Sequence, residues 1–72
     1  MRIDYDPEAD ALYIQLRQGE VDDTIQASQY IYVDVDENGL PLGIEILFAR
    51  RLLIKEDLVS ATLRINQLAP VG

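Results

Sequence analysis

The stretch that decides the fold is residues 30–48, YIYVDVDENGLPLGIEILF. Apolar and polar residues alternate on both sides of Asn38-Gly39. An Asn-Gly step between two alternating runs is the strongest short-range signal for a β-hairpin. We therefore predict two antiparallel strands that meet at this step.

The register of this hairpin follows from the rule that opposed side chains share one face of a sheet. A two-residue turn at Asn38-Gly39 pairs apolar residues with one another, namely Val35 with Leu42, Val33 with Ile44 and Ile31 with Ile46. A four-residue loop over 37–40 gives the same pairs, whereas a three-residue loop mixes the two faces. Because a one-residue slip would expose the whole apolar set, we predict a loop with an even number of residues.

The opposite face of the hairpin is acidic near the turn and aromatic or apolar at its far end. The far end carries Tyr30, Tyr32 and Leu47. Apolar side chains that cluster on a surface need a partner, which is either the C-terminal segment or a second chain. These residues are therefore the predicted interface.

A further hairpin is predicted at the start of the chain, over residues 1–17. Residues 6–10, DPEAD, have turn chemistry because proline presets φ and aspartate side chains accept hydrogen bonds from nearby backbone N–H groups. Pairing Tyr5 with Leu12 and Ile3 with Ile14 leaves a four-residue loop and puts the apolar residues on one face. Residues 18–29 connect the two hairpins, and 24–27 fit a short extended piece.

The period of the apolar residues changes after Phe48. Residues 49–52 are interpreted as a turn out of the sheet. We predict a short helix over 56–63 because acids open this segment, where the helix dipole favours negative charge. A loose tail is expected from about residue 66. The fold class is thus α+β, a single domain over 1–72 with a small antiparallel sheet of about four strands and one short C-terminal helix.

Composition limits how a chain of 72 residues can be stabilised. It has no cysteine and no histidine, so it has neither disulfides nor the usual zinc ligands. A single core of this size supplies only ~3–5 kcal/mol. We therefore expect the chain to self-associate, as a homodimer.

The net charge of −7 restricts the partners of the protein. Nucleic-acid binding depends on basic residues that neutralise phosphates, so we expect neither nucleic acid nor an anionic membrane as a partner. No apolar run approaches the ~20 residues that span a bilayer, and no signal peptide opens the chain. The expected location is the cytoplasm.

Residues 34–45 match the pattern of a calcium-binding loop, with ligand positions at Asp34, Asp36, Asn38, the Leu40 carbonyl and Glu45. Such a loop needs a helix on each side, but here both flanks alternate as strands do. We therefore expect an acidic hairpin turn and no tight calcium site. Asp34, Asp36 and Glu45 share one face in the predicted register, so they form a candidate weak ion site.

The remaining acids give no sign of catalysis. Asp4, Asp6, Glu8 and Asp10 are interpreted as a capped turn beside a solvated strand. The sequence shows no base near a serine that could activate it as a nucleophile. We therefore predict no catalytic residue and no cofactor. The leading hypothesis is a non-enzymatic protein-interaction module that docks a basic partner. The alternatives are a small carboxylate- or metal-dependent hydrolase and a purely structural homodimer.

Two stretches are informative when taken together, YDPEADALYI at 5–14 and VDVDENG at 33–39 followed by GIEIL at 43–47. In these stretches the chain resembles the small prokaryotic family DUF2283, a domain of unknown function. The resemblance covers about residues 1–60 and implies a compact sheet with a C-terminal helical turn. It implies no activity and no site residue. It also implies an antitoxin-like role, since some members are encoded beside small toxin-like proteins. The chain departs from the family pattern at 48–53, where a more polar step is expected.

Overall fold

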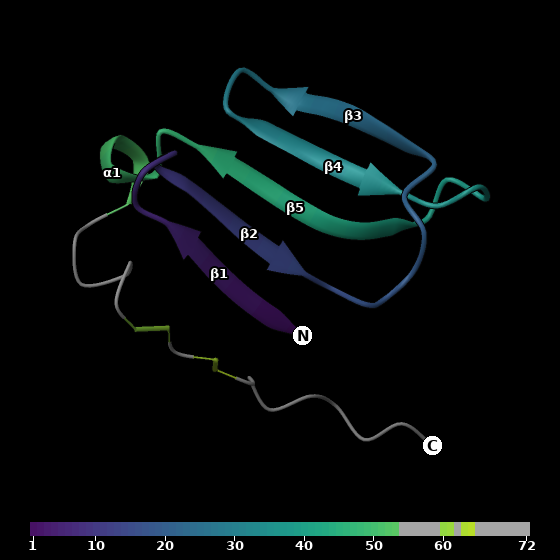
Figure 1. The fold of residues 1–72 in the computed structure, drawn as a ribbon, viewed down its shortest axis with the longest axis horizontal. Helices are drawn as coiled ribbons and strands as arrows, with labels where there is room; N and C mark the ends of the chain where they lie inside the picture. Colours follow the sequence, from purple (N-terminus) through teal and green to yellow (C-terminus); the bar gives the residue numbers. More distant parts are fainter. Residues whose placement is uncertain (54–59, 62, 65–72) are drawn as a thin grey trace.

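The computed structural model describes residues 1–53, 60, 61, 63 and 64, in which one antiparallel sheet is followed by a single helical turn (Figure 1). The strands are β1 (Arg2–Asp6), β2 (Ala11–Gln15), β3 (Asp23–Ser28), β4 (Ile31–Val35) and β5 (Pro41–Leu47), and the helix is α1 (Ala49–Leu52). Their order across the five-stranded sheet is β1-β2-β5-β4-β3. The α+β class and both predicted hairpins are confirmed. The fifth strand is β3, which contains the segment predicted only as a short extended piece.

The N-terminal hairpin has the predicted register. Tyr5 faces Leu12 and Ile3 faces Ile14, and the strands end at Asp6 and resume at Ala11. The loop between them therefore holds the predicted four residues, 7–10. Turn chemistry and apolar alternation agree here, which is why the sequence alone determines this register.

The loop of the second hairpin differs from the prediction. The backbone N–H of Gly39 donates to the carbonyl of Asp36 at 2.9 Å, and the N–H of Asp36 donates to the carbonyl of Leu40 at 2.9 Å. Residues 37–39 thus form a three-residue loop that ends on Gly39 in the left-handed region, with φ of 79°. This arrangement is a common hairpin loop, and the prediction of an even-numbered loop was wrong.

A bulge in β5 explains why the odd-numbered loop does not mix the faces of the sheet. Val35 faces Pro41 instead of the predicted Leu42, and the next pair is Asp34 with Gly43. Leu42 is therefore an extra residue that has no partner on β4. The three loop residues and this extra residue add up to the four residues of the even-numbered loop over 37–40. The predicted pairs Ile31–Ile46 and Val33–Ile44 are therefore both present.

The described part of the chain has four buried hydrophobic residues: Leu12 and Ala49 lie at the α1 end of the sheet, and Val35 and Leu42 lie where the connection from β2 to β3 crosses the end of the second hairpin. The N–H of Leu16 donates to the carbonyl of Leu42 at 2.8 Å, and the N–H of Asp22 donates to the carbonyl of Val35 at 2.8 Å. Leu42 and Val35 are buried, and Gly19 lies so close that a Cβ there would be 2.7 Å from Leu42 Cδ2. The connection can pass over the Leu42 side chain because Gly19 has no side chain of its own.

Helix α1 occupies residues that were interpreted from the sequence as a turn. Phe48 adopts a left-handed φ of 54°, which directs the chain out of β5, and the buried Ala49 begins the helix. Of the helix predicted over 56–63, residues 56–59 and 62 lie outside the described residues, as does the predicted tail from 66. The described residues Ser60, Ala61 and Leu63 belong to no helix or strand. No helix in the described part of the chain is long and apolar enough to cross a membrane.

The sheet has two chemically different faces. One face carries a row of β-branched side chains, one from each strand, which we call the aliphatic row: Ile3, Ile14, Ile44, Val33 and Ile25. The opposite face carries the polar row Asp4, Tyr13, Glu45, Tyr32 and Gln26. Helix α1 lies at the end of the sheet beside β5, so no described helix covers either face (Figure 1).

Candidate functional site

A chain of hydrogen bonds crosses the polar face from β2 to β3. The Tyr13 hydroxyl donates to Asp34 Oδ2 at 2.8 Å, and the Thr24 hydroxyl donates to Asp34 Oδ1 at 2.6 Å. Between Tyr13 and Asp34 lies Gly43 of β5, where a Cβ would overlap the Tyr13 hydroxyl and ring. Glycine is therefore required for the ring to cross the central strand. Burial, and then the hydrogen bond to Asp34, raises the pKa of Tyr13 above its ordinary value.

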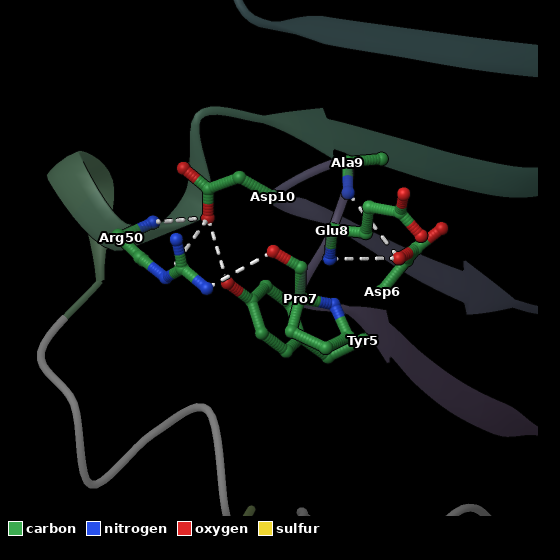
Figure 2. Close-up of polar contacts among 7 residues, drawn as sticks. All are labelled: Tyr5, Asp6, Pro7, Glu8, Ala9, Asp10 and Arg50. Atoms are coloured by element: carbon green, nitrogen blue, oxygen red, sulfur yellow. Dashed lines mark hydrogen bonds and ion pairs between the residues drawn. The ribbon is translucent and has the colours of Figure 1, made fainter.

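The turn between β1 and β2 is held by Asp6. Its Oδ1 accepts the backbone N–H of Glu8 at 3.0 Å and that of Ala9 at 3.2 Å (Figure 2). This is the capped turn predicted from the sequence, in which an aspartate satisfies the N–H groups that follow it. The Glu8 side chain itself forms no hydrogen bond or ion pair with any residue that the structure describes.

Asp10 joins this turn to helix α1. It has a left-handed φ of 54°, and its Oδ1 accepts the Tyr5 hydroxyl at 2.8 Å and the backbone N–H of Arg50 at 3.0 Å (Figure 2). The Asp10 carbonyl accepts the N–H of Ala49 at 3.0 Å, and Arg50 Nη2 donates to the Pro7 carbonyl at 3.0 Å. Burial, and then the bond to Asp10, raises the pKa of Tyr5. These contacts fix where the chain leaves the sheet.

Asp36 organises the loop between β4 and β5. Its Oδ1 accepts the N–H groups of Asn38 at 2.9 Å and Leu40 at 3.0 Å, and its Oδ2 accepts Arg17 Nη2 at 2.6 Å. The Arg17 guanidinium, followed by the Leu40 N–H, holds the pKa of Asp36 below its usual value. Asp36 therefore ties the loop to the connection between β2 and β3.

Four acids of the two motif stretches, Asp6, Asp10, Asp34 and Asp36, thus have structural partners. Within the stretches quoted above, the residues whose backbone or side chain has a clear structural role are Tyr5, Asp6, Asp10, Tyr13, Asp34, Asp36, Gly39 and Gly43. Each one closes a turn, bridges strands or leaves room for a bridging ring. These residues of the two stretches are therefore accounted for by the construction of the sheet.

The predicted weak ion site does not appear as a cluster. The segments flanking the calcium-loop pattern are the strands β4 and β5, as the alternation indicated. Asp34 bonds to Tyr13 and Thr24 on the polar face, whereas Asp36 bonds to Arg17 in the loop. Among the described residues, no group of three or more acidic side chains lies close enough together to hold a metal ion.

The predicted interface residues lie at the end of the sheet that α1 occupies. Tyr30 meets Phe48 edge to face, with ring centroids 5.7 Å apart, and the Tyr30 carbonyl accepts the N–H of Leu47 at 2.9 Å. The Arg51 guanidinium lies 5.6 Å from the centroid of the Phe48 ring, in cation–π geometry. Tyr30, Tyr32 and Leu47 are half-buried. Their role as an interface stays a prediction.

A group of acids surrounds a shallow concavity at the other end of the sheet. The concavity has a volume of about 320 Å³, and its acidic lining residues are Glu20, Asp22, Asp36 and Glu37, with Arg17 as the single basic one. Asp36 and Arg17 bond to each other. The side chains of Glu20, Asp22 and Glu37, which we call the acidic rim, form no hydrogen bond or ion pair with the described residues. Sequence reasoning missed this site because it combines a solvated connection with a distant turn.

Comparison with known proteins identifies a family. No curated protein and no solved structure matches this sequence. Over residues 2–50, which include β1 to β5 and both motif stretches, the sequence matches the family described as "Protein of unknown function (DUF2283)". The chain therefore belongs to the DUF2283 family.

Proposed function

We propose that this protein is a non-enzymatic protein-interaction module whose acidic rim binds a basic segment of a partner protein. The observation that carries the proposal is the acidic rim itself: the side chains of Glu20, Asp22 and Glu37 form no hydrogen bond or ion pair with the described residues and surround one concavity. A charged side chain that is left unpaired on a concave surface can form charge-assisted hydrogen bonds with an arginine or lysine of another protein.

The charge of the whole sheet supports an interaction with a basic partner. Residues 1–49 contain two arginines and eleven acids, a difference of −9. A field of one sign steers oppositely charged partners and raises the rate of association. The resemblance to a family of which some members are encoded beside small toxin-like proteins makes a toxin-like protein the most concrete partner, and the role would then be antitoxin-like.

The alternative of a carboxylate-dependent hydrolase has weaker support. It would use acids between Asp4 and Asp10, or Asp34 and Asp36. Asp34 already accepts two hydroxyl groups, and Asp36 accepts an arginine and two backbone N–H groups. Asp4 pairs with Arg2 at 2.8 Å on an exposed strand. A general acid or base needs a carboxyl group aimed at a substrate in a cleft, and these carboxyl groups are directed at the protein itself.

The test is affinity capture of a tagged copy from an extract of the native cell, followed by elution with increasing salt. We expect a basic protein in stoichiometric amount, released as salt screens the charges. A tagged copy that captures no basic protein would contradict the proposal and favour the purely structural alternative. A hydrolytic activity that is lost in Asp34→Asn without unfolding would instead support the enzyme alternative.

A further inference from the structure

We propose that a second copy of this chain packs on the aliphatic row, so that two sheets form a face-to-face sandwich. The two members at the sheet edges, Ile3 and Ile25, are 43% and 49% exposed, and the three central members are half-buried. The acidic rim and the aliphatic row have no residue in common. The proposal is therefore independent of the partner proposed above.

The first argument is the geometry of the row. Ile3 faces Ile14, Ile14 faces Ile44, Ile44 faces Val33, and Val33 faces Ile25, so β-branched side chains cross all five strands without interruption. Antiparallel sheets of this kind bury an apolar face by packing another sheet about 10 Å away with strands about 30° apart. A second copy supplies a matching face through a two-fold axis.

Charge is the second argument. Two copies that each carry a net charge of −7 repel one another, and the polar face and both ends of the sheet carry acids. On the face of the aliphatic row, the cross-strand pairs of β3 and β4 place a single charged residue, Asp23, opposite Val35 at one corner. Like-charged copies can therefore approach closely on this face, because the desolvation of charged groups is small there.

The area of the face sets the strength of the dimer. Five strands about 4.8 Å apart and about five residues long, at about 3.4 Å per residue, cover roughly 400 Å². A standard interface buries about 800 Å² per partner, so the predicted dimer belongs to the small, weak class. We expect a dissociation constant from about 10 μM to 1 mM.

The first test is the molar mass of the full chain by sedimentation equilibrium as its concentration rises. We expect the mass to increase from 8.1 kDa towards twice that value. Ile25→Lys and Gln26→Lys make a matched pair, because they add the same charge to neighbouring exposed positions of β3 that point to opposite faces. Ile25→Lys should weaken the dimer about tenfold or more, since a buried charge is costly, and Gln26→Lys should leave it unchanged.

Three results would overturn the proposal. The chain could stay monomeric at about 1 mM, where half or more of it should be paired. Gln26→Lys could dissociate the dimer while Ile25→Lys does not, which would place the interface on the face of Tyr32 and Leu47. The mass could also fall as salt is added. Self-association through an uncharged face should strengthen with salt because salt screens the repulsion between the copies, whereas binding of a basic partner should weaken.

A second measurement does not depend on whether the lysine variants fold. The chain has no cysteine, so Ile25→Cys and Gln26→Cys each introduce one thiol. The reaction of the Ile25→Cys thiol with an alkylating reagent should slow several-fold as protein concentration rises, because the dimer covers it. The Gln26→Cys thiol should react at a constant rate. Equal behaviour of the two thiols would contradict the proposed interface.

Discussion

The Tyr13 hydroxyl donates a 2.8 Å hydrogen bond to Asp34, and it reaches this carboxylate by crossing the backbone of Gly43. The two residues are 21 positions apart in the sequence and lie on β2 and β4, which are separated by β5. Because the same carboxylate accepts Thr24 from β3, one aspartate of β4 connects side chains of β2 and β3. The polar face is thus held by side chains as well as by the backbone ladder.

Gly43→Ala should destabilise the protein. The new methyl group would overlap the Tyr13 ring, so the ring must move and lose Asp34. We expect a loss of about 1–3 kcal/mol in the free energy of unfolding, measured with urea. In a Tyr13→Ala background the same substitution should cost much less, because the ring is gone. An equal cost in both backgrounds would contradict the proposed role of Gly43.

Tyr13→Phe removes the hydroxyl and keeps the ring. We expect a loss of about 1 kcal/mol at neutral pH. The pKa of Tyr13 is raised in the folded protein, so its contribution is complete below the unfolded value of about 10 and is lost as pH rises through the folded value. Urea unfolding between neutral and alkaline pH should therefore show a fall in stability that is smaller in Tyr13→Phe. A fall of the same size in both proteins would exclude this bond as its cause.

Asp36→Asn should change the response to acid. The folded pKa of Asp36 is lowered, so its contribution to stability is present above the unfolded value of about 3.9 and is lost as pH falls through the folded value. Thermal unfolding followed between pH about 5 and about 2 should show a smaller acid-induced loss in Asp36→Asn than in the wild type. Glu37→Gln is the control, because this side chain lies in the same loop and forms no hydrogen bond or ion pair with the residues that the structure describes.

Asp10→Ala should be costlier than Asp10→Asn. Alanine in the left-handed conformation of residue 10 costs about 1–2 kcal/mol, and the bonds to Tyr5 and the Arg50 N–H are lost as well. Asparagine tolerates this conformation and keeps an acceptor oxygen. Chemical denaturation of the two variants and of Glu8→Ala, which changes an exposed acid of the same turn, gives the comparison. If all three lose the same stability, the bridge from Asp10 to α1 contributes nothing.

Local signals predicted most of the fold. Alternation and turn residues predicted both hairpins and the register of the first one. In the first hairpin a single register satisfies both the turn chemistry of residues 6–10 and the apolar alternation of the two strands. The bulge at Leu42 was not predictable, since an odd-numbered loop and an extra residue together leave the same alternation as an even-numbered loop. Helix α1 depends on its bonds to Asp10, which is about 40 residues away. The acidic rim combines residues from a connection and a turn, which only the folded topology brings together.

The claim that the chain acts through its acidic rim is tested most directly by the affinity of the captured basic partner for two charge-matched variants, measured by titration calorimetry. Glu20→Gln/Glu37→Gln removes two charges from the rim, and Asp4→Asn/Glu8→Gln removes two from exposed positions on the β1–β2 hairpin. We expect the rim variant to bind about tenfold more weakly and the control variant to bind as the wild type does. Equal weakening of both would mean that net charge alone attracts the partner, and unchanged binding of the rim variant would place the interface elsewhere.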